Sequence, residues 1–352
     1  MISIYKVDEK EEWNRIVKSF KDFDLYYLAE YTKAFEIHGD GEPILIYFQN
    51  DTIKGMNVVM KRDISVDKNF EGEIPSNTYF DITTPYGYGG FILEGEITEE
   101  NLQLLNTEYV SLCKKNGIVS EFVRFHPVLN NSKALEEIYD ITRLGKTITM
   151  KLESPELIWE NLISKNRNVI RKAKKSGIEI YWGRNADLIA EFIKMYNATM
   201  DKDQAKDYYY FKKEFYSSIL DDLKYNSLIF YALYNGKVIS MSMIIFSNHQ
   251  MHYHLSASNK EFQHLAPTNL LLYEAACWGA ENGYKTFHLG GGLGSKEDNL
   301  YKFKKAFNRD SETSFSIGKK VFDLDSYNNL MNLRRKEQRF CNDSLFFPKY
   351  RS

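Results

Sequence analysis

The chain has 352 residues, which is enough for about two domains with cores of their own. Hydrophobic residues make up 43% of it, and 46 Lys and Arg against 48 Asp and Glu leave a formal net charge of -2, which excludes a globally basic nucleic-acid-binding domain. No apolar run reaches the ~20 residues of a membrane-spanning helix, and the N-terminal residues lack the pattern of a secretory signal, so we expect a cytoplasmic protein.

Two stretches of the chain show the same succession of predicted elements, each opening with a hairpin across a short polar turn. The first succession has strands at 43–49, 53–60 and 78–82, a helix at 99–116 and a strand at 122–125. The second has strands at 227–234, 237–246 and 251–256, a helix that ends before Gly283 and a strand at 285–289. Because the order repeats, we predict two copies of one α+β unit.

A single long helix over 154–177 is predicted to join the two copies. Ser154 and Pro155 form a typical helix start, apolar residues recur at helical spacing, and Gly177 ends the pattern. The predicted domains are therefore 1–146 and 147–352. Asn166 lies on the apolar stripe of this helix, where its amide needs a hydrogen-bond partner.

The joining helix is also rich in basic residues. Six occur within eleven positions, namely Lys165, Arg167, Arg171, Lys172, Lys174 and Lys175. A solvated helix face is one interpretation of such a run, and binding of phosphate groups is the other.

The loop that follows the strand 78–82 carries two tyrosines between glycines. It spans 84–90, and Asp81 precedes it. A structural turn explains the proline and the glycines, whereas Tyr86 and Tyr88 also suit a binding surface with exposed phenols.

The glycine-rich segment 287–295 leads from a strand into a helix. It imitates a dinucleotide fingerprint but lacks the βαβ context, so we expect its main chain to approach a ligand closely instead. Ser295 and Asp298 have the spacing of a capping box.

The helix after this segment has an apolar stripe of Leu300, Phe303 and Phe307. At 100° per residue Lys304 borders the stripe, while Lys302 and Lys305 fall on the far side. Lys304 is either a surface lysine whose stem packs on the helix or a cation directed into a site.

Metal and disulfide chemistry are not indicated. His252 and His254 are expected to share one strand face, but no carboxylate or cysteine accompanies them at ligand spacing, so packed histidines are favoured over a metal site. The cysteines are odd in number and widely spaced, which indicates buried thiols; they are Cys113, Cys277 and Cys341.

Several motifs together resemble the FemA/FemB/FemX-like family of the GNAT superfamily. They are TPYGYGG at 84–90, RFHP at 124–127, KNRNVIRKA at 165–173, PTNLLLYE at 267–274, LGGG at 289–292, LYKFKK at 300–305 and FFPKYR at 346–351. The resemblance covers nearly the whole chain and implies two tandem GNAT-like domains, the first for substrate binding and the second for acyl transfer.

The resemblance further implies transfer of an amino acid from aminoacyl-tRNA to an amine of a UDP-linked or lipid-linked peptidoglycan precursor. No cofactor, metal or covalent enzyme intermediate is implied. The family's Phe-Lys pair corresponds to Phe303 and Lys304, and places Lys304 beside the reacting ester. The substrate-binding residues implied or favoured by their position are Asp81, Tyr86, Tyr88, Arg167, Arg171, Lys174, Lys202, Tyr208 and Tyr253. Lys202 stands where the family pattern has an arginine.

An acyl-CoA-dependent N-acyltransferase that modifies an amino sugar or another surface-polymer precursor is the alternative. A CoA site in this superfamily binds pyrophosphate on main-chain N–H groups at a helix start. The corresponding loop, 259–268, has no glycine, and Pro267 has no N–H, which favours the tRNA-dependent reaction. A non-catalytic scaffold with a degenerate site is the third class of function.

Overall fold

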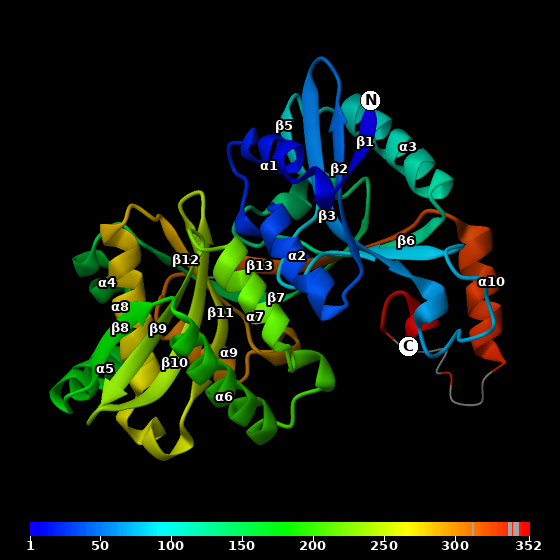
Figure 1. Ribbon diagram of the computed structural model, residues 1–352. Coiled ribbons are helices and arrows are strands. Elements are labelled where there is room, and N and C mark those ends of the chain that lie inside the picture. The colour runs from blue at the N-terminus through cyan, green and yellow to red at the C-terminus, as the bar shows by residue number, and fades with distance from the viewer. Residues whose placement is uncertain (312, 337–339, 341–344) are drawn as a thin grey trace. The chain divides into compact units, whose positions relative to one another are not determined.

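The computed structural model describes residues 1–311, 313–336, 340 and 345–352 (Figure 1). Within them the chain forms two compact units. Unit 1 comprises Met1–Leu144 and Phe315–Ser352, and unit 2 comprises Gly145–Ser314. None of the helices in the described ranges has the length and apolar character needed to cross a membrane.

Unit 1 is built on a mixed sheet with the strand order β1-β2-β3-β4-β6-β13, and β5 also pairs with β3. Its strands are β1 (Ile2–Lys6), β2 (Glu42–Gln49), β3 (Ile53–Asp63), β4 (Phe80–Thr83), β5 (Ile92–Gly95), β6 (Ile118–Arg124) and β13 (Thr313–Val321). Its α-helices are α1 (Lys10–Lys18), α2 (Ala29–His38), α3 (Glu99–Lys115) and α10 (Leu324–Arg335). Short 3-10 turns lie at Val7–Glu9, Leu25–Tyr27, Ile64–Val66, Asn131–Leu135 and Lys349–Arg351. The β2–β3 hairpin and α3 supply much of the core, in which Tyr109 and Phe125 are fully enclosed.

Unit 2 has a second mixed sheet with the order β7-β12-β11-β10-β9-β8. Its strands are β7 (Asp140–Lys151), which belongs to this unit from Gly145 onward, β8 (Glu179–Gly183), β9 (Ser227–Tyr234), β10 (Lys237–Ser247), β11 (Gln250–Ser258) and β12 (Thr286–Gly290). The helices are α4 (Pro155–Asn161), α5 (Ser164–Lys175), α6 (Ala186–Lys202), α7 (Lys213–Asp222), α8 (Pro267–Glu281) and α9 (Asn299–Lys305), with 3-10 turns at Asp207–Tyr209, Lys260–Leu265 and Leu293–Ser295. α8 packs on β9, β10 and β11 and also contacts α4 and α5, while α6 packs against β10 and β11. This arrangement buries the sheet between helices.

The predicted duplication is confirmed at the level of element order. In each unit an antiparallel hairpin (β2–β3, β9–β10) is followed by a third strand, a helix and a fourth strand parallel to the third. The parallel pairs are β4–β6 and β11–β12, as a strand–helix–strand connection requires. The fold is therefore mixed α/β with two related units.

The predicted joining helix is wrong in one respect, because it consists of two helices. Leu162 and Ile163 are extended, with ψ of 143° and 149°, and separate α4 from α5. The Ile163 N–H donates to the Ala306 carbonyl at 3.1 Å, and the Asn161 carbonyl accepts from Arg309 N–H at 3.1 Å. Helical spacing continued across the break because Leu162 is buried in the same core as its neighbours.

The C-terminal segment also differs from the expected division at residue 147. Residues from Phe315 onward belong to unit 1, because β13 pairs antiparallel with β6, with Ile317 opposite Arg124. Tyr350 completes this attachment, since its ring is fully buried in unit 1 and its hydroxyl lies 2.8 Å from the Ser120 hydroxyl. The sequence carries no repeat or linker that would signal such a return.

Candidate functional site

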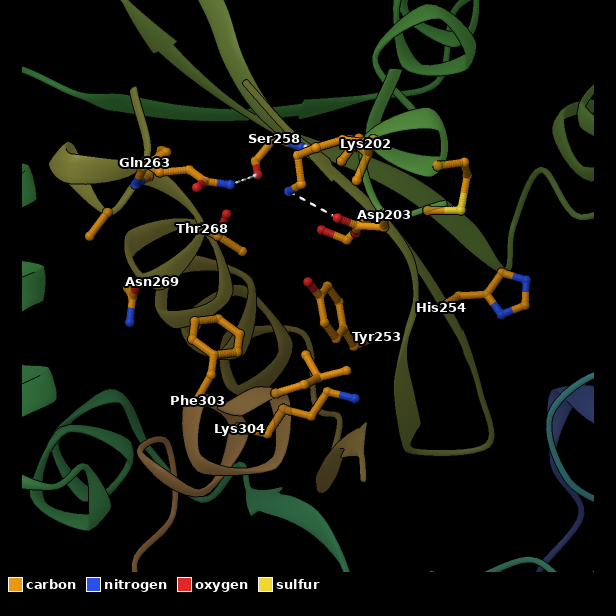
Figure 2. Close-up of a pocket in the computed structure, with 17 residues that line it drawn as sticks. Lys202, Asp203, Tyr253, His254, Ser258, Gln263, Thr268, Asn269, Phe303 and Lys304 are labelled. Carbon is orange, nitrogen blue, oxygen red and sulfur yellow. Dashed lines mark hydrogen bonds and ion pairs between the residues drawn. The ribbon is translucent and has the colours of Figure 1, made fainter. Parts of the chain in front are cut away.

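A pocket of about 480 Å³ lies in unit 2 (Figure 2). Four elements surround it: the C-terminal end of α6, the second half of β11, the N-terminal end of α8, and α9. Its polar and charged lining residues are Thr199, Lys202, Asp203, Tyr253, His254, Ser256, Ser258, Gln263, Thr268, Asn269 and Lys304. The pocket therefore brings together the predicted residues Lys202, Tyr253, Phe303 and Lys304.

A β-bulge in β11 shapes one wall of the pocket. Leu255 pairs with Met243 but Tyr253 pairs with Ile244, so His254 is an extra residue in the strand. His254 is half-buried beside His252, and burial together with the nearby His252 lowers the pKa of His254 to about 3. Figure 2 shows the Tyr253 ring directed toward the pocket and the His254 ring directed away from it. His252 is buried with its ring 6.0 Å from that of His288.

The N-terminal end of α8 forms the opposite wall. Ala266 takes a left-handed conformation with a φ of 54°, and Pro267 occupies the first helical position. The Thr268 hydroxyl lies 2.9 Å from that of Ser240, which ties the helix start to β10. First-turn N–H groups have no partner within their helix, so the Thr268 and Asn269 main chain offers donors at the pocket.

Lys304 is the buried cation of the site. Only 9% of its surface is exposed, and its Nζ donates to the Gly291 carbonyl at 2.7 Å. Burial lowers the pKa of Lys304 to about 8, against a smaller opposing effect of the Asp298 carboxylate. An ammonium has three N–H groups, so two donors remain beside the pocket when Lys304 is protonated.

The helix that carries Lys304 is rotated relative to the predicted stripe. Tyr301 is buried, whereas Leu300 is 36% exposed and only borders the pocket. Lys304 consequently lies on the buried face of α9 itself, not at its border. The predicted capping box is also wrong: Asp298 is the N-cap, accepting from the Tyr301 N–H at 2.9 Å, and Ser295 lies in the preceding turn.

The glycines before α9 approach other main chain of unit 2. A Cβ on Gly291 would lie 2.8 Å from the Lys146 carbonyl oxygen, and one on Gly292 would lie 2.0 Å from the Lys296 carbonyl oxygen. This close packing presents the Gly291 carbonyl to Lys304. The segment thus positions the cation, and the expected close approach to a ligand stays a prediction.

Lys202 and Tyr208 lie near the C-terminal end of α6. Lys202 lines the pocket and forms an ion pair with Asp203 at 3.2 Å (Figure 2). Tyr208 is 40% exposed, packs edge-on against Tyr209 and is not among the residues that line the pocket. The structure therefore brings only Lys202 of this pair to the pocket.

The predicted phosphate-binding residues of α5 make contacts within unit 2. Arg167 Nη1 donates to the carbonyls of Glu160 and Leu162, at 3.2 and 2.9 Å, and so closes the break between α4 and α5. Arg171 lies 5.0 Å from the centre of the Trp159 ring, and Lys174 forms an ion pair with Glu274 at 2.7 Å.

The remaining cations of α5 are exposed. Lys165, Lys172 and Lys175 all face solvent. No ion pair or hydrogen bond within the described ranges engages their side chains, so these three lysines are the better placed to meet phosphate.

The predicted partner of Asn166 is present. This buried amide donates to the Ala306 carbonyl at 3.2 Å and accepts from Asn269 Nδ2 at 2.8 Å. Asn166 therefore connects α5 to α8 and to the residue that follows α9.

The tyrosine loop belongs to unit 1. Tyr86 stacks on Phe35 with ring centres 5.5 Å apart, and Tyr88 packs edge-on against Tyr26 at 5.7 Å. Burial raises the pKa of the Tyr88 phenol. Both tyrosines are half-buried, so their phenols are less exposed than the loop pattern predicted.

Asp81 is fully buried on β4. Its carboxylate accepts from Arg62 Nε at 2.7 Å, from Arg351 and from the Tyr350 hydroxyl at 3.2 Å. These contacts anchor the C-terminal segment to the sheet of unit 1. A substrate contact of Asp81 remains a prediction beside this structural role.

Several pocket residues were not singled out from the sequence. Ser256 and Ser258 alternate along β11, and Thr268 and Asn269 follow Pro267 at the start of α8. Period-two serines in a strand and polar residues in the first turn of an apolar helix were the available signals. Both buried cysteines in the described residues, Cys113 and Cys277, are free thiols as predicted, and Cys341 lies outside those residues.

Comparison with known proteins shows a domain match and a shared fold. Residues 163–305, which include every residue that lines the pocket, match the model of the acetyltransferase (GNAT) domain family. Among solved structures, FemX has a TM-score of 0.67 at 13% identity over 93% of this chain and 99% of its own. A conserved protein of unknown function from Bacteroides thetaiotaomicron has a TM-score of 0.59 at 13% identity, over 91% of this chain and 99% of its own.

The C-terminal domain of a putative lysylphosphatidylglycerol synthetase from Agrobacterium fabrum has a TM-score of 0.56 at 13% identity, over 92% of this chain and 94% of its own. No curated protein matches the sequence. At these identities the structures show a shared fold, while the family model identifies an acetyltransferase (GNAT) domain within unit 2. The chain is thus an acyltransferase that matches the acetyltransferase (GNAT) domain over residues 163–305 and shares its fold with FemX.

Proposed function

We propose that this protein transfers an aminoacyl group from aminoacyl-tRNA to an amine of a cell-wall precursor, in the pocket of unit 2. The observation that carries the proposal is the position of Lys304, a buried lysine at a polar pocket within the GNAT domain. The resemblance of the sequence to the FemA/FemB/FemX-like family supports this choice of donor and acceptor.

The reaction needs little covalent chemistry from the protein. The amine nitrogen attacks the ester carbonyl, a C–N bond forms, and the C–O bond to the terminal ribose breaks. The proton lost by the amine ends on the ribose hydroxyl. Negative charge develops on the carbonyl oxygen in between, and a positioned donor there commonly contributes 10²- to 10³-fold in rate. The Lys304 ammonium is proposed as that donor, with Phe303 packing beside the ester.

The remaining predicted residues are proposed to bind substrate. Lys202, at the pocket but paired with Asp203, is suited to a phosphate of the precursor, as a point charge rather than a bidentate fork. Tyr253 presents a phenol whose pKa is raised by burial, so it stays protonated and acts as a hydrogen-bond donor or acceptor. Asp81, Tyr86, Tyr88 and Tyr208 are assigned to the precursor on the family resemblance alone.

The acyl-CoA-dependent reaction is the second candidate. Two observations favour it: the matched family model describes an acetyltransferase domain, and the first turn of α8 opens on the pocket. Against it, Pro267 removes one main-chain donor from that turn and the preceding loop contains no glycine. We therefore favour the tRNA-dependent reaction.

One experiment separates the two donors. The protein is incubated with a panel of UDP-linked and lipid-linked muropeptides, and with either charged tRNAs or acetyl-CoA, and the acceptor mass is followed. Mass gains that match an amino acid and require charged tRNA support the proposal. A gain of one acetyl group from acetyl-CoA alone contradicts it.

A further inference from the structure

The chain of amides from Ala306 through Asn166 to Asn269 fixes the direction of one side chain in the pocket. The Ala306 carbonyl can only accept, so the group of Asn166 that lies 3.2 Å from it is the NH₂. The Asn166 oxygen is thereby left to accept from Asn269 Nδ2, at 2.8 Å. Each amide in the chain has only one orientation that satisfies its neighbour.

These hydrogen bonds fix the orientation of the Asn269 side chain. Because Asn269 uses its NH₂ toward Asn166, its carbonyl oxygen is the group left for the pocket that Asn269 lines. Within the part of the chain that the structure describes, no donor bonds to this oxygen. An amide oxygen at a partly enclosed pocket wall calls for a hydrogen-bond donor from a ligand.

The hydrogen-bonded amides are held in place by the surrounding packing. Asn166 is 3% exposed, and the packing of α5 on α8 fixes both its backbone and its reach. The third member, Ala306, follows directly on α9, and its N–H donates to the Phe303 carbonyl at 3.3 Å. The acceptor is therefore positioned relative to the helix that carries Lys304. Figure 2 shows Asn269 and Phe303 on the same side of the pocket.

We infer that Asn269 is a specificity-determining residue that accepts a hydrogen bond from the α-ammonium of the transferred aminoacyl group, and that Asn166 is its positioning residue. The inference rests on the proposed function, and it deepens it by naming the chemistry of the acyl group. Lys304 donates to the carbonyl oxygen of the ester, and the ammonium lies one carbon away from that carbonyl. An acetyl group has no donor for Asn269, and would leave its oxygen unpaired.

The opposite polarity of the two groups is what makes the pocket selective. Lys304 offers donors only, and the side-chain oxygen of Asn269 is an acceptor, so an acyl group with an oxygen and a neighbouring ammonium satisfies both. Hydrogen bonds to charged groups contribute about 1.5–3 kcal/mol, which corresponds to roughly 10- to 100-fold in affinity.

The test compares two stable ligands that differ only in the amino group. They are a short acceptor-stem RNA carrying a 3′-amide-linked alanyl group and the same RNA carrying a propionyl group, with binding measured by calorimetry. We expect the wild-type protein to bind the alanyl RNA roughly 10- to 100-fold more tightly. Asn269→Leu, which keeps the volume but removes the acceptor, should reduce this ratio to about 1–3 while leaving propionyl binding unchanged.

Two further variants guard against a simple packing defect. Asn269→Ser retains a hydroxyl that can donate to Asn166 and accept from the ligand, so it should recover part of the ratio. Asn166→Ala removes the partner of the Asn269 amide, which can then rotate. The alanyl-to-propionyl ratio should therefore fall, although residue 166 does not contact the ligand. Asn168→Ala, an exposed change on the same helix, is the matched control and should keep the wild-type ratio.

The outcomes distinguish this inference from the proposed function. Aminoacyl transfer from tRNA together with an unchanged alanyl-to-propionyl ratio in Asn269→Leu would overturn the inference alone. A reduced alanyl-to-propionyl ratio in all four variants, including the Asn168→Ala control, would also overturn it. Transfer from acetyl-CoA with none from any aminoacyl-tRNA would contradict the proposed function and this inference with it.

Discussion

Replacing Lys304 with methionine separates a catalytic lysine from a structural one, because the two roles predict opposite effects on stability. Methionine keeps an unbranched apolar stem of similar length and removes the charge. Lys304 has a pKa of about 8 in the folded protein against the ordinary 10.5. At about 1.4 kcal/mol for each tenfold, burying the charged form costs about 3 kcal/mol at neutral pH.

Because methionine has no charge to bury, the variant does not bear that cost, but the Gly291 carbonyl is left without its donor. An unpaired carbonyl costs about 1–2 kcal/mol when it is partly shielded from water, so Lys304→Met should be as stable as the wild type or about 1–2 kcal/mol more stable at pH 7. Chemical denaturation with an unchanged m-value measures this difference. The rate of acyl transfer should nevertheless fall by roughly 10²- to 10³-fold.

The pH dependence has a definite sign. The folded-state pKa is lowered, so between about 8 and 10.5 the unfolded chain binds more protons and the stability of the wild type rises with pH. The stability advantage of Lys304→Met should therefore shrink over that window. In catalysis the ammonium is needed, so the ratio of wild-type to variant rates should fall as the pH rises through about 8.

The matched control is Lys302→Met, on the exposed face of α9. Lys305 is less suitable, because its Nζ donates to the Ser311 carbonyl at 3.0 Å. Equal rates for Lys304→Met and Lys302→Met would refute the catalytic role. A loss of more than about 2 kcal/mol of stability in Lys304→Met would show that the lysine is structural.

Four further predictions concern α5 and unit 1. The double variant Lys165→Ala, Lys172→Ala should keep the melting temperature within about 1 °C. It should reduce the slope of log affinity for tRNA against log salt by about 0.7–0.9 for each lost phosphate contact. An unchanged slope would show that these lysines of α5 only face solvent. Arg167→Ala should lower the free energy of unfolding by about 1–3 kcal/mol through the carbonyls it leaves unpaired, as denaturant titration would show. Asp81→Asn should cost unit 1 about 3–5 kcal/mol, because its two arginine partners lose their buried counter-charge, and wild-type stability would disprove the anchoring role. Gly87→Ala should destabilise unit 1 markedly, since φ is +101° and a Cβ would lie 2.3 Å from the Tyr26 ring; an unshifted thermal melt would contradict this.

The sequence by itself determined the elements and their repetition. Alternating apolar runs around the turns at Asn50 and Asn235 specified both hairpins, and glycines at 117 and 283 ended the helices that follow them. These signals are local, since a turn or a helix end depends on residues a few positions apart. The lysine of the Phe-Lys pair could also be singled out locally, from its place beside apolar residues on a short helix.

Tertiary structure decided the features that depend on distant partners. Two helices replace the predicted joining helix because the main chain around Leu162 bonds to residues 306–309, about 145 positions away. The bulge at His254 depends on the partner strand β10, because it is the pairing register with β10 that shifts between Met243 and Ile244.

The same reason explains the candidate site. Whether Lys304 is exposed or buried depends on the Gly291 carbonyl and on the pocket wall formed by α8 and β11, none of which is encoded in the helix that carries it. Likewise, the sequence alone could not separate the two roles found among the basic residues of α5. Arg167 bonds to carbonyls at the break between α4 and α5, whereas Lys165 faces solvent. Local patterns fix which residues form each element, whereas burial and pairing are set by the elements that fold against it.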